Sequence, residues 1–127
     1  EGLRANLTEG AAEWEKYLRF CEETLAVSKE EDRPYYAGIC AALGKKERFP
    51  DLLRGLDSSL PVDRNFAISV LACALGPEFE QETMPKTDDD FLNRWPEFRA
   101  KILVEFKRIE TSLRYDATQV RYLTVPK

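Results

Sequence analysis

The chain has 127 residues, no histidine and a formal net charge of −4. Its length corresponds to about one domain, and 43% hydrophobic with 33% charged residues is typical of a folded protein with a charged surface, not of a disordered one. The absence of histidine excludes Ser-His-Asp and Cys-His catalysis, histidine-ligated metal sites and an imidazole pH switch.

The first predicted element is a leading helix over residues 8–27. Thr8 is its candidate N-cap, and its apolar residues recur at three- and four-residue spacing, which places them on one face. That stripe consists of Trp14, Leu18, Cys21 and Leu25.

A helix-pair unit is predicted next, over residues 32–57. Asp32 is the expected N-cap of its first helix, which ends at Gly44, a residue suited to a left-handed conformation. The second helix runs over residues 48–56, with a proline near its start. The predicted inward residues are Tyr36, Ile39, Cys40, Leu43, Leu52, Leu53 and Leu56.

A second unit is predicted over residues 60–115. Ser59 or Asp63 is expected to cap its first helix, which the Gly-Pro pair at residues 76–77 ends. Thr87 or Asp88 is expected to cap a short turn, and a long helix is expected over residues 97–115. Its stripe is Phe98, Ile102, Phe106, Ile109 and Leu113. Residues 116–127 are predicted to be an extended tail without a pairing strand.

Two stretches of the chain resemble each other. Residues 32–44 read DRPYYAGICAALG, and residues 63–76 read DRNFAISVLACALG. A similar segment follows each stretch: residues 48–56 (RFPDLLRGL) follow the first, and residues 94–102 (RWPEFRAKI) follow the second. Three residues separate the first stretch from its segment, whereas seventeen separate the second stretch from its segment. The simplest interpretation is two stacked helix-pair units, the second of which carries an insertion.

Residues 42–76 resemble a HEAT-like helical repeat of the phycobilisome-lyase type. The matching positions are Ala42, Leu43, Gly44, Pro50, Leu52, Leu53, Leu56, Asp63, Arg64, Ala74, Leu75 and Gly76. The resemblance implies a curved helical scaffold that binds protein. The metal-binding relatives of this fold rely on His-Glu motifs, which this chain cannot supply.

The insertion holds most of the negative charge. Residues 77–90 contain six acids against one base, a net charge of −5, so the rest of the chain is close to neutral. Such a segment repels nucleic acid and attracts a basic protein surface. The predicted partner-binding residues are Glu78, Glu80, Glu82, Asp88, Asp89, Asp90 and Trp95. Two alternatives stay open: the insertion is a solvated linker ended by a helix cap, and Trp95 is a core residue instead of an exposed anchor.

No pattern indicates catalysis, a metal site or a cofactor. The carboxylate runs are sequence neighbours, and adjacent helical side chains point about 100° apart, so these runs do not form facing acid–base pairs. Residues 88–90 lack the spacing of an EF-hand loop. Reduced core thiols are predicted at Cys21, Cys40 and Cys73, the last two at equivalent places in the two units, and a disulfide between two of the three stays possible.

The sequence therefore predicts an all-α, single-domain protein of about five helices with HEAT-like helix pairs. The expected function is non-enzymatic protein binding through the acidic insertion. The alternatives are an inhibitor or immunity protein that plugs the basic active site of a toxin or other enzyme, and a fragment of a longer helical-repeat scaffold. A carboxylate-based enzyme ranks last. No apolar run approaches the ~20 residues of a membrane span, so a cytoplasmic location without membrane or nucleic-acid partners is expected.

Overall fold

The structure is a computed structural model that describes the backbone of residues 11–125 and the side chains of residues 15–125. Seven α-helices and one two-stranded sheet within this range confirm the predicted all-α class. The helices are α2 (Ala11–Val27), α3 (Arg33–Ala42), α4 (Phe49–Arg54), α5 (Pro61–Leu75), α6 (Pro77–Thr83), α7 (Asp88–Asn93) and α8 (Trp95–Ile109), and the strands are β1 (Leu113–Asp116) and β2 (Arg121–Thr124). The predicted cap Thr8 and the side chain of Trp14 lie outside the described part.

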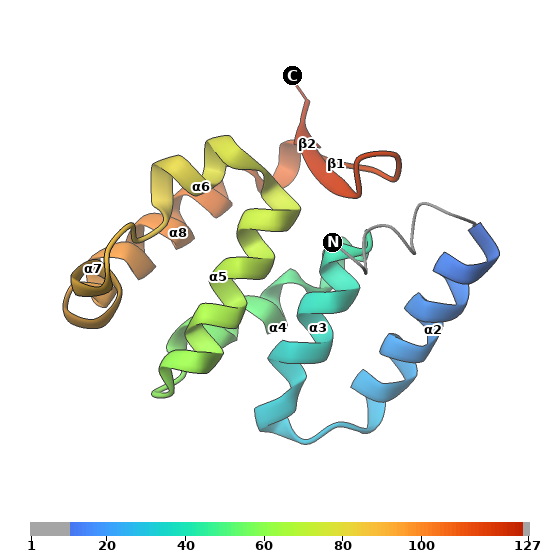
Figure 1. The fold of residues 1–127 in the computed structure, drawn as a ribbon. Coiled ribbons are helices and arrows are strands. Elements are labelled where there is room, and N and C mark those ends of the chain that lie inside the picture. Colours follow the sequence, from blue (N-terminus) through green and yellow to red (C-terminus); the bar gives the residue numbers. More distant parts are fainter. Residues whose placement is uncertain (1–10, 126–127) are drawn as a thin grey trace.

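Two hydrophobic clusters hold the helices together. Figure 1 shows α2, α3 and α5 side by side, with α4 behind α3 and α5 and α8 behind α6. The larger cluster joins α4, α5, α6, α8 and the hairpin around Phe49, Leu71 and Ile102, each exposed by 1% or less. The smaller cluster packs α2 on α3 through Cys21, Leu25 and other residues. Tyr115 packs against both clusters, so the hairpin links the two parts of the core.

Proline, not a capping side chain, opens most of the helices. Asp32 lies at the N-cap position of α3, as predicted, but its side chain makes no capping bond. At α5 the N-cap position is held by Leu60, so the predicted caps Ser59 and Asp63 are wrong. Each of these helices has proline in its first turn, where the missing N–H removes a donor that would otherwise need a partner. The carboxylate of Asp63 instead accepts a hydrogen bond from the hydroxyl of Ser58. At α7 one predicted cap is confirmed, because Thr87 accepts a bond from the Asp90 amide at 3.0 Å.

The last predicted helix is too long. It ends at Ile109 instead of near Tyr115, and a short 3-10 turn leads into β1. The expectation of an unpaired tail is also wrong, because β1 and β2 pair antiparallel, with Leu113 opposite Thr124. Leu113 is buried, as its place in the apolar stripe predicted, but it is buried from a strand. The helical spacing continued by chance into a segment whose side chains pack from the hairpin.

The hairpin closes the ends of α3 and α5. The hydroxyls of Tyr122 and Tyr115 donate hydrogen bonds to the carbonyls of Ala41 (2.7 Å) and Ala42 (3.0 Å), which lie in the last turn of α3. Carbonyls at a helix end lack the usual amide donor of the next turn. The Ala41 carbonyl also accepts from the Gly44 amide at 3.1 Å, and the two tyrosines add side-chain donors at this end of α3. Both predicted glycine stops are confirmed, with φ of +109° at Gly44 and +95° at Gly76.

Hairpin side chains also lie directly against these two glycines. A Cβ at Gly44 would stand 3.0 Å from the Tyr115 ring, and one at Gly76 would stand 2.2 Å from the guanidinium of Arg121. The Leu-Gly endings of the two similar stretches therefore do two things. They stop the helices, and they leave room for the hairpin to pack over both ends.

Candidate binding surface

The acidic insertion is folded into helices and is not a linker, although a helix cap, Thr87, does lie near its end as that alternative expected. Residues 77–83 form α6, and α7 follows after a short connection. The side chains of Phe79, Thr83 and Met84 lie on one side of the segment and are buried, with exposed fractions of 3%, 2% and 6%. The spacing of Phe79 and Thr83, four residues apart, places them on one face of the helix. This face fixes α6 to the core and directs its acids outward.

The three acids of α6 are exposed, but basic residues stand near two of them. Glu78 lies 3.7 Å from Arg121 of β2. Glu82 interacts electrostatically with Arg108 of α8. Glu80 has no hydrogen bond or ion pair with any described residue. Part of the charge in this segment is therefore offset by cations from distant parts of the chain.

The three acids of α7 occupy its first turn, where a carboxylate interacts favourably with the helix dipole. The carboxylate of Asp90 accepts a hydrogen bond from the Lys86 amide and forms an ion pair with Arg94 at 3.1 Å. The Lys86 amide is the main cause that holds the pKa of the Asp90 carboxyl below its usual value. Asp89 accepts a bond from Asn93, whereas Asp88 has no partner among the described residues. Asp90 is thus a structural residue as well as a charged one.

Trp95 belongs to the core, which supports the second of its two predicted roles. Only 6% of its surface is exposed, and its indole N–H donates to the carbonyl of Leu56 at 3.0 Å. Its ring meets the edge of Phe91, and the guanidinium of Arg64 lies 5.3 Å from the ring centre. In this position the indole is not available as a surface anchor.

Two of the three cysteines predicted to lie in the core are buried, and the third is exposed. Cys21 and Cys40 are buried free thiols, exposed by 1% and 0%, as expected of core residues. Cys73, predicted to share the core role of Cys40, is exposed, because residue 73 lies on the outward side of α5. Burial raises the pKa of Cys40 to about 11. At neutral pH Cys40 is therefore a protonated thiol, not a nucleophile.

The buried thiol makes the stability fall in alkaline solution. The pKa of Cys40 is about 11 in the folded chain against 9.0 ordinarily, so above pH 9 the unfolded chain loses this proton first. We expect the free energy of unfolding to fall by about 2 kcal/mol between pH 9 and 11 from Cys40 alone. Burial also raises the pKa of Tyr122, which steepens the loss above pH 10.

Urea unfolding at pH 7.5, 9, 10 and 11 measures this slope. Cys40→Ala is expected to flatten it, whereas the exposed-site control Cys73→Ala is expected to keep it. Equal slopes for all three proteins would contradict the assignment of the effect to Cys40.

The described residues contain no group of three or more Cys, Asp or Glu side chains that could hold a metal ion. No helix in the described part is both long and apolar enough to cross a bilayer.

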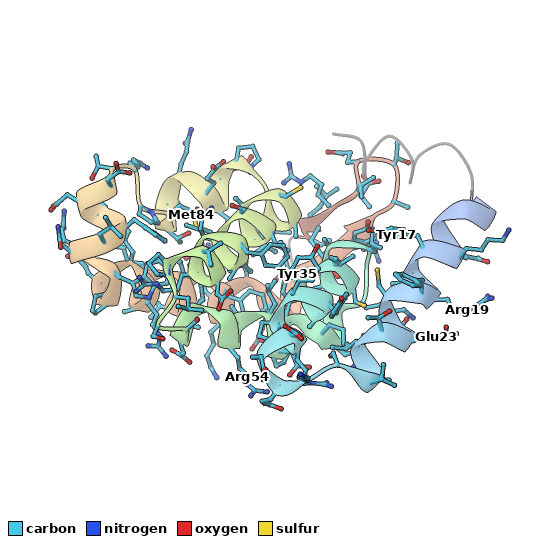
Figure 2. The ribbon with its side chains drawn as sticks, turned by 60° about the horizontal axis from the view of Figure 1, so that its bottom comes forward. Tyr17, Arg19, Glu23, Tyr35, Arg54 and Met84 are labelled. Carbon is cyan, nitrogen blue, oxygen red and sulfur yellow. The ribbon has the colours of Figure 1, made fainter. Side chains whose placement is uncertain are left out.

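The sequence did not point to a groove at the start of α3 and α5. This α3–α5 groove is a cleft of about 500 Å³ whose lining includes Tyr35 and Arg54, both labelled in Figure 2. Tyr35 and Phe66 hold the same place in the two similar stretches, the aromatic position after Asp-Arg. Their rings stack with centres 4.7 Å apart. That shared position was the one sequence signal that could have revealed the groove.

Comparison of the chain with family models, with curated proteins and with solved structures returns no match.

Proposed function

We propose that this protein is a non-enzymatic binding module that attracts a protein partner with a basic surface. The contact is the acidic face, defined as the carboxylates of α6 and α7, all of them exposed except the partly buried Asp90. These residues are Glu78, Glu80, Glu82, Asp88, Asp89 and Asp90. Trp95, buried in the core, is not part of it.

The observation that carries the proposal is the way α6 is attached. Phe79 and Met84 fix the segment to the core, so its acids stand at defined positions instead of moving on a loop. A preorganised charged surface loses little conformational entropy on binding, and complementary charge mainly accelerates association. The resemblance of residues 42–76 to HEAT-like repeats, which commonly bind protein, favours the same function.

Neighbouring cations partly neutralise some acids of the face, and these acids attract a partner less strongly. Arg121 stands beside Glu78, and Arg94 beside Asp90, so these two acids already have an ion-pair partner. Glu80 and Asp88 have none among the described residues, and Glu82 has only a longer-range interaction with Arg108. The three acids Glu80, Glu82 and Asp88 are therefore expected to contribute most.

The test is capture of partners by the full chain and by two matched variants. The first, Glu80→Gln/Glu82→Gln/Asp88→Asn, removes the least compensated charges of the acidic face. The control, Glu15→Gln/Glu23→Gln/Glu47→Gln, removes three exposed acids elsewhere that form no ion pair with described residues. Both variants change the net charge equally, from −4 to −1.

We expect the control to retain the partners of the wild-type chain and the acidic-face variant to lose them. If the acidic-face variant captures the same proteins in the same amounts, the proposal is wrong. If the captured partner is an enzyme whose activity the wild-type chain abolishes, the module acts as an inhibitor through the same face.

A further inference from the structure

We propose that the α3–α5 groove is a second docking site, which takes a short basic segment of a partner with an apolar side chain next to a Lys or Arg. This inference rests on the proposed function for the class of partner, a protein, but it uses residues outside the acidic face. The groove lies where α3, the end of α4 and the start of α5 meet. Its volume of about 500 Å³ is within the range of known ligand clefts.

Two glycines set the shape of the groove. A Cβ at Gly38 would come within 2.9 Å of Leu52 and 3.1 Å of Phe66, so its absence lets the Phe66 ring lie against α3. A Cβ at Gly55 would lie 3.3 Å from Ala67 and 3.4 Å from the side chain of Pro34. These close approaches bring α3, α4 and α5 together beneath the groove and hold its floor rigid.

The floor is apolar and partly open to solvent. Phe66 stacks on Tyr35, and Tyr35 meets Tyr36 edge to face with ring centres 5.1 Å apart. Tyr35 is 49% exposed, and Val62 on the opposite side of the groove is 70% exposed. A fixed aromatic surface beside an exposed aliphatic side chain is suited to an apolar group of a ligand, which would gain by leaving water.

The rim is strongly acidic. Four carboxylates line the groove, at Glu30, Glu31, Asp57 and Asp63, against one guanidinium, that of Arg54. Glu30 pairs with Arg54, and Asp57 pairs with Arg99 of α8.

The other two carboxylates of the rim have no cation beside them. Asp63 accepts only from the Ser58 hydroxyl, and Glu31 has no partner among the described residues. Both line the groove, so a cation there can pair with either carboxylate without breaking an existing ion pair.

This charge pattern selects the occupant. A nucleic-acid backbone would be repelled by the uncompensated carboxylates. An apolar peptide without a cation would cover Glu31 and Asp63 without compensating their lost hydration. A segment with a cation beside an apolar residue satisfies both parts of the groove at once.

The test is an NMR titration of the full chain, labelled with ¹⁵N, with the peptide acetyl-Leu-Arg-Val-Lys-amide. The matched peptide acetyl-Leu-Gln-Val-Gln-amide lacks the cations. We expect the basic peptide to shift the amides around Tyr35, Val62 and Phe66, and the neutral peptide to shift them far less. Glu31→Gln/Asp63→Asn is expected to raise the dissociation constant of the basic peptide about fivefold, since each exposed ion pair with the peptide contributes modestly to the binding free energy.

Two more variants separate the groove from general charge effects. Val62→Arg, at an exposed position, is expected to abolish the shifts by placing a cation and a long side chain in the groove. Glu15→Gln/Glu23→Gln, on α2, is expected to leave them unchanged. In every variant the amide spectrum away from the substitution reports whether the fold is intact.

Four results would overturn the groove assignment. Shifts confined to α6 and α7 would leave the proposed function standing and reject the groove. An absence of shifts anywhere, or equal shifts with the neutral peptide, would reject it as a basic-segment site. Groove shifts that depend on protein concentration without peptide would instead identify a second copy of the chain as the occupant.

Discussion

Tyr122→Ala is expected to lower the free energy of unfolding by about 3–5 kcal/mol, as for other buried aromatic residues cut to alanine. Tyr122 is 1% exposed, and its ring packs against Phe49 and Tyr115 with centres about 5 Å away. Its hydroxyl also donates to the carbonyl of Ala41. The substitution removes the most buried of the contacts that join the hairpin to the main core, and it leaves a cavity. For a stability of about 5–15 kcal/mol this is a large fraction.

Tyr122→Phe separates the hydrogen bond from the packing. It keeps the ring and removes one donor from the Ala41 carbonyl, which still accepts from the Gly44 amide, so a cost of about 0.5–1.5 kcal/mol is expected. Urea unfolding followed by circular dichroism measures both variants. If Tyr122→Ala costs no more than Tyr122→Phe, the hairpin does not contribute to the core as described.

Gly76→Ala is expected to be the second most destabilising change, at about 2–4 kcal/mol. The φ and ψ of Gly76 are +95° and 173°, a region of backbone conformation almost confined to glycine. A Cβ there would also stand 2.2 Å from the guanidinium of Arg121. Backbone strain and a steric clash therefore act together at the junction of α5 and α6.

A double variant distinguishes the two causes. Arg121→Ala removes the clashing side chain, so Gly76→Ala on that background is expected to cost only the backbone strain, about 1–3 kcal/mol. The measurement is again the free energy of unfolding in urea. A Gly76→Ala protein as stable as the wild type would contradict the geometry at this residue.

The helices could be predicted from the sequence because their apolar spacing and their glycine stops are local signals. Leu52, Leu56 and Ile102, all predicted inward, are each exposed by 1% or less. The hairpin could not be predicted, because Leu113 continues the helical spacing and β2 has no apolar alternation of its own. What stabilises it is tertiary: Tyr122 enters the core, and Tyr115 and Arg121 pack over two distant glycines. Long-range contacts of this kind produce no periodic pattern of apolar residues in the sequence.

The candidate site was predictable in composition but not in arrangement. The sequence placed six acids together, but two of the cations near them, Arg121 of β2 and Arg108 of α8, come from far along the chain. The burial of Trp95 could not be predicted for the same reason: its indole N–H bonds to the carbonyl of Leu56, 39 residues away in the chain. The α3–α5 groove arises only when the starts of α3 and α5 meet, although the shared aromatic position was visible in the repeat.

The central claim is that the acidic face steers a basic partner, and the salt dependence of association tests it most directly. With the partner recovered by capture, the association rate constant is measured between about 0.01 and 1 M salt, where the Debye length falls from about 30 to about 3 Å. We predict that the wild-type rate falls about tenfold or more over this range. The rate of Glu80→Gln/Glu82→Gln/Asp88→Asn should start lower and change less, and that of Glu15→Gln/Glu23→Gln/Glu47→Gln should follow the wild type. Identical rates and salt slopes for the acidic-face variant and the wild type would contradict the account.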